Sequence, residues 1–297
     1  MAWYHLTRPD DPELDVLAAR FHLHPLHIED ARSAGERVKV EGGGKYTFAL
    51  LKTLRSPSGT DDPLKRKIVL FASHDRNCPD DEKFSIVIAD TSRAEIAAAL
   101  QRAEAERDCE NPVRLLYLVF DSIVDSYFPS IDALDDELDA LQERVVSPGR
   151  NNLLSDIFAL KEKLVNARRL LVSTRDASMH LQRDSGIPLN SEHQLYLRDL
   201  YDHISRLLDT VETQRDLLNN ALDIYLSGIA NRSTEVMKVL TVLSTVALPA
   251  LVITGVYGMN IKGLPFVNSN YAAEFVLALT LLITGGLLAW FRYLRWF

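Results

Sequence analysis

Two long apolar runs near the end of the chain are separated by a short polar connection. The runs cover residues 239–256 and 275–291. At a helical rise of about 1.5 Å per residue, each run can cross a hydrocarbon core about 30 Å thick. The formal charges between the two runs are Lys262 and Glu274, and both lie in or beside the connection. The pattern predicts a hairpin of two membrane helices with an uncharged, amide-bearing tip, which is unusual for an anchor alone and indicates a pore entrance.

Helical spacing continues upstream of the first apolar run without a break. Residues 191–194 read Ser-Glu-His-Gln, a capping box, and no proline follows before Pro249. We therefore predict one helix of about 65 residues, about 100 Å long, that joins the polar part of the chain to the membrane. Six positions of this helix step by four and three, a heptad seam typical of helices that pack side by side: Leu200, Ile204, Leu207, Val211, Gln214 and Leu218.

The preceding residues divide into two patterns. Residues 1–108 predict a mixed α/β domain, with runs of strand length and one helix at the end. After Asn111 and Pro112, which suit a helix start, the pattern changes to long helices over residues 111–146 and 153–183. The predicted strands are 38–40, 46–54, 68–71 and 84–89, and the predicted helix of the α/β domain is 92–105. Three glycines at 42–44 predict a turn rather than a phosphate-binding loop, because no helix and no Lys-Ser/Thr follows them.

Charge separates the two parts of the chain further. The whole chain carries −8 and the residues from Lys238 onward carry +3, which leaves −11 for residues 1–237. Such a surface repels nucleic acid and attracts cations. Basic residues flank the two spans on their polar sides, so both termini are expected in the cytoplasm and the tip outside: Arg232, Lys238, Arg292 and Arg295.

Neither a leader segment nor an enzyme signature is found. The first residues carry no basic and apolar signal pattern, and the two cysteines, Cys78 and Cys109, have no metal-like spacing, which suits a reducing cytosol. No nucleophile–base pair, phosphate loop or zinc motif is present, so we expect no enzyme. His22, His24 and His27 form a cluster by count, but Pro25 interrupts them, and packing explains them better than metal binding.

The tip and the long helix carry a resemblance to a known family. The tip reads Tyr257-Gly258-Met259-Asn260, residues 197–203 read LRDLYDH, residues 235–241 read EVMKVLT, and residues 24–30 read HPLHIED. Together they resemble the CorA family of divalent-cation channels of the Gly-Met-Asn type, over nearly the whole chain.

The resemblance implies an α+β protein that assembles as a homopentamer in the inner membrane, with a funnel-like stalk of long helices. It implies a channel for divalent cations, mainly Mg²⁺ and also Co²⁺ or Ni²⁺, gated by cytosolic Mg²⁺ and in contact with membrane lipid. On this basis we expect a cytosolic α/β domain at 1–108, long antiparallel cytosolic helices at 109–190, a stalk helix continuing into the first transmembrane helix at 191–257, an extracytoplasmic loop at 258–271, and the second transmembrane helix with a basic cytosolic tail at 272–297.

We assume that the helix face bearing Gly255 is turned toward the pore axis, which identifies the face of the long helix that would line the path of the ion. Stepping back by threes and fours, this face is small, hydroxylic or aliphatic, and it is uncharged until Asp223. A hydrated ion can pass hydroxyls and carbonyls, whereas rings of Met237, Leu240 and Leu248 would close by dewetting. The expected pore-lining and gate residues are Asp223, Thr234, Met237, Leu240, Ser244, Leu248, Leu251 and Gly255, and the expected selectivity filter is Gly258, Met259 and Asn260.

Carboxylates of the stalk are the candidates for regulation. Asp199 matches a family position that helps to bind a regulatory cation between subunits, and Asp90 is its expected acidic partner. Asp209 and Asp216 are interpreted as a solvated helix face. Asn260 also suits a helix C-cap, and both roles are compatible.

Two other functions remain open on the sequence. One is a proton-coupled Zn²⁺ transporter of the same superfamily, because the connection after the tip, residues 262–266, lacks the acidic loop common in Mg²⁺ members. Retention of Met259 favours magnesium. The other is a membrane-anchored cytosolic sensor that conducts nothing, for which the uncharged face and Asn260 would have no purpose.

Overall fold

A computed structural model describes residues 2–54, 66–73, 83–92, 94–105, 112–146, 153–183, 191–259, 265 and 270–294. The chain divides into two compact units, Met1–Leu222 and Asp223–Phe297, and the boundary falls inside the long helix α7 (Ser191–Gly258).

The first unit contains a five-stranded sheet with the strand order β1-β5-β4-β3-β2. The pairs β2–β3, β3–β4 and β4–β5 are antiparallel, and β1 lies parallel to β5 at one edge. The four predicted strands are confirmed, whereas β1 was not predicted. The strands are β1 (Ala2–Leu6), β2 (Lys39–Gly42), β3 (Tyr46–Lys52), β4 (Lys67–Ser73) and β5 (Phe84–Ala89).

The turn between β2 and β3 needs its glycines. Gly44 has a φ of +82°, a conformation that favours glycine, and a Cβ at Gly43 would lie 2.3 Å from the ring of Tyr46. The Gly43 N–H donates to the Tyr46 carbonyl at 2.7 Å and closes the turn. The predicted turn is therefore confirmed, and the glycines serve to let the Tyr46 ring lie against the backbone.

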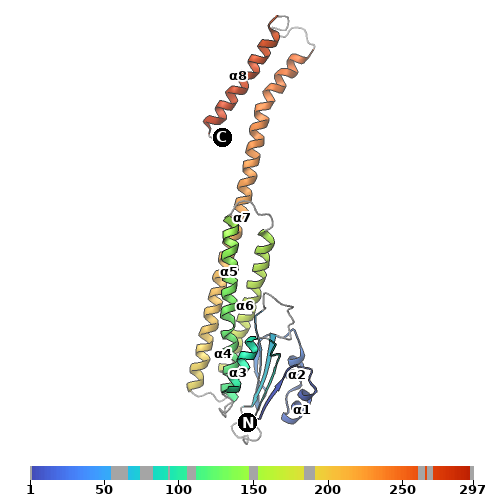
Figure 1. Ribbon diagram of the computed structural model, residues 1–297, viewed down its shortest axis with the longest axis vertical. Coiled ribbons are helices and arrows are strands. Elements are labelled where there is room, and N and C mark those ends of the chain that lie inside the picture. The colour runs from blue at the N-terminus through green and yellow to red at the C-terminus, as the bar shows by residue number, and fades with distance from the viewer. Residues whose placement is uncertain are drawn as a thin grey trace. The chain divides into compact units, whose positions relative to one another are not determined.

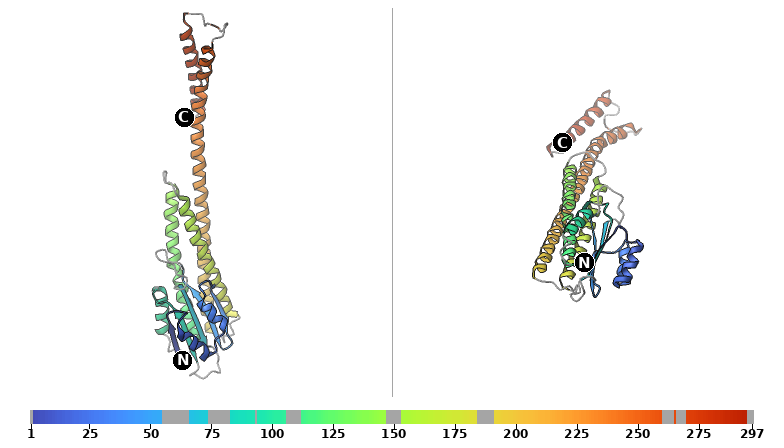
Figure 2. Two further views of the ribbon diagram at one scale, coloured as in Figure 1. Left: turned by 90° about the vertical axis from the view of Figure 1, so that its right-hand side faces the viewer. Right: turned by 60° about the horizontal axis from the view of Figure 1, so that its bottom comes forward.

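Helices cover both faces of this sheet (Figures 1 and 2). On one face, α1 (Pro12–Phe21) and α2 (Pro25–Arg32) bury their apolar side chains against alternate residues of the strands. On the other face lie α4 (Pro112–Asp125) and α6 (Leu153–Arg183). Because both faces are covered, β3 to β5 are buried almost throughout, and α3 (Ala94–Ala105) packs against α4.

Both ends of the short helix α2 are capped by other groups. Pro25 occupies its first turn, where the missing N–H costs nothing, and the Nδ1 atom of His24 accepts the N–H of Leu26 at 3.2 Å. At the other end, the Lys67 ammonium on β4 donates to the carbonyls of Asp30 at 3.0 Å and Ser33 at 2.7 Å. Burial lowers the pKa of Lys67 to about 8.

The helix predicted over 111–146 is divided in the structure at Ser126, into α4 and α5 (Tyr127–Val146). Pro129 has no N–H for the carbonyl of Asp125, so the helical ladder loses a bond there. The buried Tyr127 donates its hydroxyl to the Lys52 carbonyl at the end of β3, which fixes the start of α5. The predicted helix over 153–183 agrees with α6.

The heptad seam of α7 is buried at all six predicted positions. One of them is polar: the Gln214 amide nitrogen donates to the Ile131 carbonyl and to Asp135 Oδ1 of α5, both at 3.2 Å. A buried polar residue in such a seam favours one register over others. The seam therefore fixes the position of α7 along α5.

The second unit consists of the last part of α7 and of α8 (Ala272–Tyr293), which runs alongside it (Figure 1). The Tyr257 ring contacts the Phe275 ring with centroids 6.5 Å apart. Among the described residues of this unit, only Val242 and Phe291 are buried.

Candidate functional site

Two helices of the structure are long and apolar enough to cross a membrane, one within α7 and the other α8. In the most apolar window of each, 6% and 0% of the residues are buried. Since the core helix of a soluble domain would be mostly buried, these two helices are of the kind that needs an apolar solvent. They coincide with the two predicted spans.

The spanning part of α7 has one face that is partly covered and one that is open. The partly covered residues recur at helical spacing, and the ring contact of Tyr257 with Phe275 turns this face toward α8. They are Val242, Thr245, Val246, Pro249, Ala250, Ile253 and Tyr257.

The residues expected from the sequence to line the pore lie on the opposite, open face. At 100° per residue, they are centred about half a turn away from the face that is turned toward α8. All of them are exposed in the single chain: Asp223, Thr234, Met237, Leu240, Ser244, Leu248, Leu251 and Gly255. An apolar face with 60–69% exposure at Met237, Leu240, Leu248 and Leu251 is a surface that something else must cover.

Hydroxyl groups on this side of α7 are already bonded within the helix. Thr234 Oγ1 donates to the Ala230 carbonyl at 2.9 Å, and Thr241 Oγ1 donates to the Met237 carbonyl at 2.8 Å. Each hydroxyl hydrogen is used in this way, so each oxygen keeps its lone pairs for an outside donor. Such oxygens can accept hydrogen bonds from the water shell of a cation.

The predicted filter lies where α7 ends. Gly258 is its last residue, and Met259 follows with its N–H donated to the Val256 carbonyl at 3.3 Å. Gly258 and Met259 are exposed. Asn260, the third filter residue, lies outside the described residues.

A cluster of possible cation ligands lies in the first unit, between α4 and α7. Ligand atoms of Asp121, Asp125 and His203 lie within 4.8 Å of one another. Asp121 is buried, and the loss of water around it and the nearby Asp125 raise the pKa of its carboxyl group. Arg102 of α3 lies 3.2 Å from Asp121 and 3.7 Å from Asp125, so it partly neutralises the pair.

This cluster adjoins one of the two predicted regulatory residues. Asp199 Oδ1 lies 3.8 Å from His203 Nε2, one turn away on α7, and its side chain is 59% exposed. Asp90, the expected partner, follows β5 and accepts the N–H of Ser92 at 2.8 Å in a local turn. Within one chain, the structure therefore groups Asp199 with His203 and its neighbours rather than with Asp90.

Sequence reasoning missed Asp121, Asp125 and His203. The available signal was Asp121, a charged residue in the apolar stretch of α4, with a second carboxylate four residues later on the same face. Carboxylates suit Mg²⁺, which prefers oxygen ligands. To bind one, the cluster would have to release Arg102 from Asp121.

The three N-terminal histidines each have a structural role. His22 ends α1 with a φ of 53°, and His24 caps α2. His27 is buried, with its ring stacked on Phe48 at 4.5 Å. Packing therefore accounts for the His27 imidazole and capping for that of His24, whereas the exposed His22 contributes its backbone conformation.

Comparisons with known proteins agree on one family. Residues 1–293 match the family described as CorA-like Mg²⁺ transporter protein. The chain is similar to the cobalt/magnesium transport protein CorA of Thermotoga maritima, with 32% identity over 93% of this chain and 77% of that protein. It is also similar to the putative metal ion transporter YfjQ of Bacillus subtilis, with 29% identity over 100% of this chain and 91% of that protein. Among solved structures, the CorA magnesium transporter of Methanocaldococcus jannaschii has the same fold, with a TM-score of 0.81 at 22% identity over 98% of this chain and 89% of that one.

Proposed function

Because the chain belongs to the family of CorA-like Mg²⁺ transporter proteins, we propose that it is a homopentameric channel that passes hydrated Mg²⁺ into the cytosol. Family membership makes it a membrane transporter of divalent cations, not an enzyme. The expectation of no enzyme is thereby confirmed. The pentamer, the channel mechanism, the inner-membrane location with cytoplasmic termini and the gating are the proposal.

The observation that carries the proposal is the open face of α7. The face turned toward α8 is partly covered, while the opposite face exposes Met237, Leu248 and Leu251 and offers hydroxyl oxygens. Copies of the chain that turn this face toward a common axis would cover it and enclose a path. Its lining has no charge until Asp223, so it cannot replace the water shell that Mg²⁺ gives up reluctantly. A hydrated ion is therefore the species that this path suits.

The same lining residues would also close the channel. Apolar rings of Met237, Leu240 and Leu248 would exclude water when narrow, and an ion cannot cross a dry constriction. At the outer end, Gly258 and Asn260 supply neutral oxygens, which suit contact with the waters of an intact hexahydrate. Zn²⁺ prefers the nitrogen of His and the thiolate sulfur of Cys, whereas Met259 offers only a thioether. The outer end therefore suits hydrated Mg²⁺ better than Zn²⁺.

We propose that cytosolic Mg²⁺ holds the channel closed through Asp199. Carboxylates brought together repel each other unless a cation lies between them. Asp199 and the cluster of Asp121, Asp125 and His203 place such groups on two helices, α4 and α7. A bound cation would join these helices, and its loss would free α7, which carries the gate.

Flux into liposomes containing the full-length protein tests the conducting role. With separate Mg²⁺, Zn²⁺ and proton gradients, we expect Mg²⁺ influx driven by membrane potential alone. External cobalt(III) hexaammine, an inert mimic of a hexahydrated ion, is expected to block it. The variant Asn260→Ala should abolish flux while the assembly stays intact, and the matched control Asn270→Ala, in the same connection, should conduct normally.

The two alternatives give different results in the same assay. Proton-driven Zn²⁺ uptake that the hexaammine does not inhibit would identify the zinc transporter instead. A correctly assembled wild-type protein that conducts no divalent cation would identify the sensor. Normal flux in assembled Asn260→Ala would leave that residue as a helix cap only.

A further inference from the structure

A polar network centred on the buried side chain of His27 joins α2 to the sheet of the first unit. The His27 Nδ1 atom lies 2.9 Å from the Tyr46 hydroxyl oxygen of β3. Its Nε2 atom lies 3.2 Å from Glu41 Oε2 of β2. The Tyr46 oxygen also accepts the backbone N–H of His24 at 2.7 Å. One imidazole therefore connects α2 to two strands.

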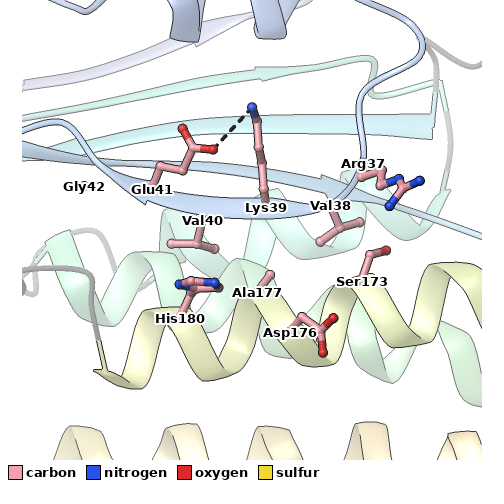
Figure 3. A pocket seen from close by; sticks show the side chains of 10 residues that line it. All are labelled: Arg37, Val38, Lys39, Val40, Glu41, Gly42, Ser173, Asp176, Ala177 and His180. Carbon is pink, nitrogen blue, oxygen red and sulfur yellow. Dashed lines mark ion pairs between the residues drawn. The ribbon is translucent and has the colours of Figure 1, made fainter.

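Successive side chains of a strand point to opposite faces, so Lys39 and Glu41 of β2 lie on the same side of the sheet. Val38 and Val40 point toward α6, into a recess of about 420 Å³, while Lys39 and Glu41 leave the strand on the opposite side (Figure 3). There the Lys39 ammonium lies 2.7 Å from Asp30 of α2 and 3.4 Å from Glu41. Glu41 thus lies between the Lys39 ammonium and the His27 ring.

The hydrogen-bond partners assign the proton of the neutral imidazole. An ionised Glu41 carboxylate can only accept, so Nε2 of His27 carries the hydrogen and donates it. Nδ1 is then an acceptor, and the Tyr46 hydroxyl donates to it. In this state every polar atom of His27 and Tyr46 is paired.

Protonation of His27 disrupts this arrangement at its Nδ1 atom. A hydrogen on Nδ1 would point at the Tyr46 oxygen, so the hydroxyl hydrogen of Tyr46 would have to turn away. The rings of Phe71 and Phe84 border the Tyr46 ring, with centroids 5.9 Å and 6.3 Å away, so the hydroxyl is held at the edge of the core. The Tyr46 hydroxyl would have to exchange its acceptor, and a positive charge on the buried His27 ring is costly because burial removes water from it.

We propose that His27, Tyr46 and Glu41 form a proton-sensitive latch, which holds α2 on the sheet while His27 is neutral and releases it when His27 takes up a proton. The charged and titratable groups that face the ring are His24 and Asp30 from α2, Glu41 and Lys39 from β2, and Tyr46 from β3. The latch is independent of which ion the protein transports.

Burial gives the direction of the response. It lowers the pKa of His27 below the ordinary value of 6.5, and the Glu41 carboxylate offsets this only in part. The released state therefore binds the proton more tightly than the latched state. The latch is complete above about pH 6.5 and weakens as the pH falls through the lowered pKa.

Hydrogen–deuterium exchange of the full-length protein tests the latch in two ways. Exchange at the C2 position of each histidine reports its own titration, and we expect a midpoint for His27 below that of an exposed histidine. Amide exchange over α2 should be about three- to tenfold faster at about pH 5.5 than at about pH 7.5, after correction for intrinsic rates. A His27 midpoint at or above the ordinary value would overturn the proposal, with no variant required.

Two variants separate the latch from the neighbouring cap. The Gln side chain of His27→Gln can both donate and accept but does not titrate, so amide exchange over α2 should lose its dependence on pH. His24→Asn keeps a good N-cap and removes the neighbouring imidazole, whose ring centroid lies 5.6 Å from that of His27, so the wild-type response should persist. An unchanged response in His27→Gln, or its loss in His24→Asn alone, would assign the effect to another group.

Discussion

In the first unit, residues Met1–Leu222, the apolar side chains of sheet and helices are buried within the chain, whereas in the second, Asp223–Phe297, most are exposed. Phe120 on α4 has no exposed surface, while Leu282 on α8 is 73% exposed. Both residues lie on regular helices. The difference is where each unit finds its apolar environment.

An exposed apolar side chain therefore has a different meaning in each unit. The first unit has its own core, in which both faces of one sheet are covered by helices, so most of its large apolar side chains are buried within the chain. In the proposed assembly, the second unit would find its apolar environment in lipid around α8 and in further copies of the chain beside the open face of α7. Lipid offers no hydrophobic gain for helix association, so packing and hydroxyl groups would have to hold copies of α7 together in the proposed assembly.

The largest expected effect tests whether the first unit carries its own core. Phe120→Ala, at a fully buried site, should lower the free energy of unfolding by about 3–5 kcal/mol. Phe158→Ala, on α6 and 54% exposed, is the matched control and should change it by less than about 0.5 kcal/mol. Chemical denaturation of the full chain followed by circular dichroism measures both. Equal losses would mean that Phe158 is covered in the assembled protein.

The second prediction tests the open face of the second unit. Met237→Ala and Leu248→Ala should each raise Mg²⁺ flux about two- to tenfold and weaken shut-off, because a wider apolar ring dewets less readily. Val242→Ala, on the face turned toward α8, is the matched control and should leave flux unchanged. Liposome flux under identical gradients compares the three. Unchanged flux in both test variants would place these side chains toward lipid or neighbouring helices.

The smallest expected effect concerns coupling between the units through α7. Asp199→Asn should raise the Mg²⁺ concentration that protects the first unit from protease by about three- to tenfold, since one proposed ligand loses its charge. Asp209→Asn, on the same helix in a solvated position, should protect as the wild type does. Limited proteolysis over a Mg²⁺ series measures the midpoint. A wild-type midpoint in Asp199→Asn would make this residue a solvated stalk residue.

Much of the architecture could be predicted because it depends on local periodicity. The two spans, the start of α7, α6 and the heptad seam all follow from spacing that each segment carries itself. The strands β2 to β5 are also local, since short apolar runs and turn residues mark them. The division at Ser126 was missed because apolar spacing continues across it, while the missing N–H of Pro129 interrupts only the hydrogen bonds.

Sequence patterns alone were enough for the strands β2 to β5, the helices α3, α6 and α7 and the two apolar spans, and they placed the tip residues between the spans. They did not show β1, α1, α2 or the division at Ser126. The tertiary structure alone decided that β1 pairs in parallel with β5, that Asp121 and Asp125 meet His203, and that His27 lies between Tyr46 and Glu41. In each case the partners are far apart in the chain or belong to different elements. Periodicity records which face of an element is apolar, but which polar atoms meet depends on how the faces pack.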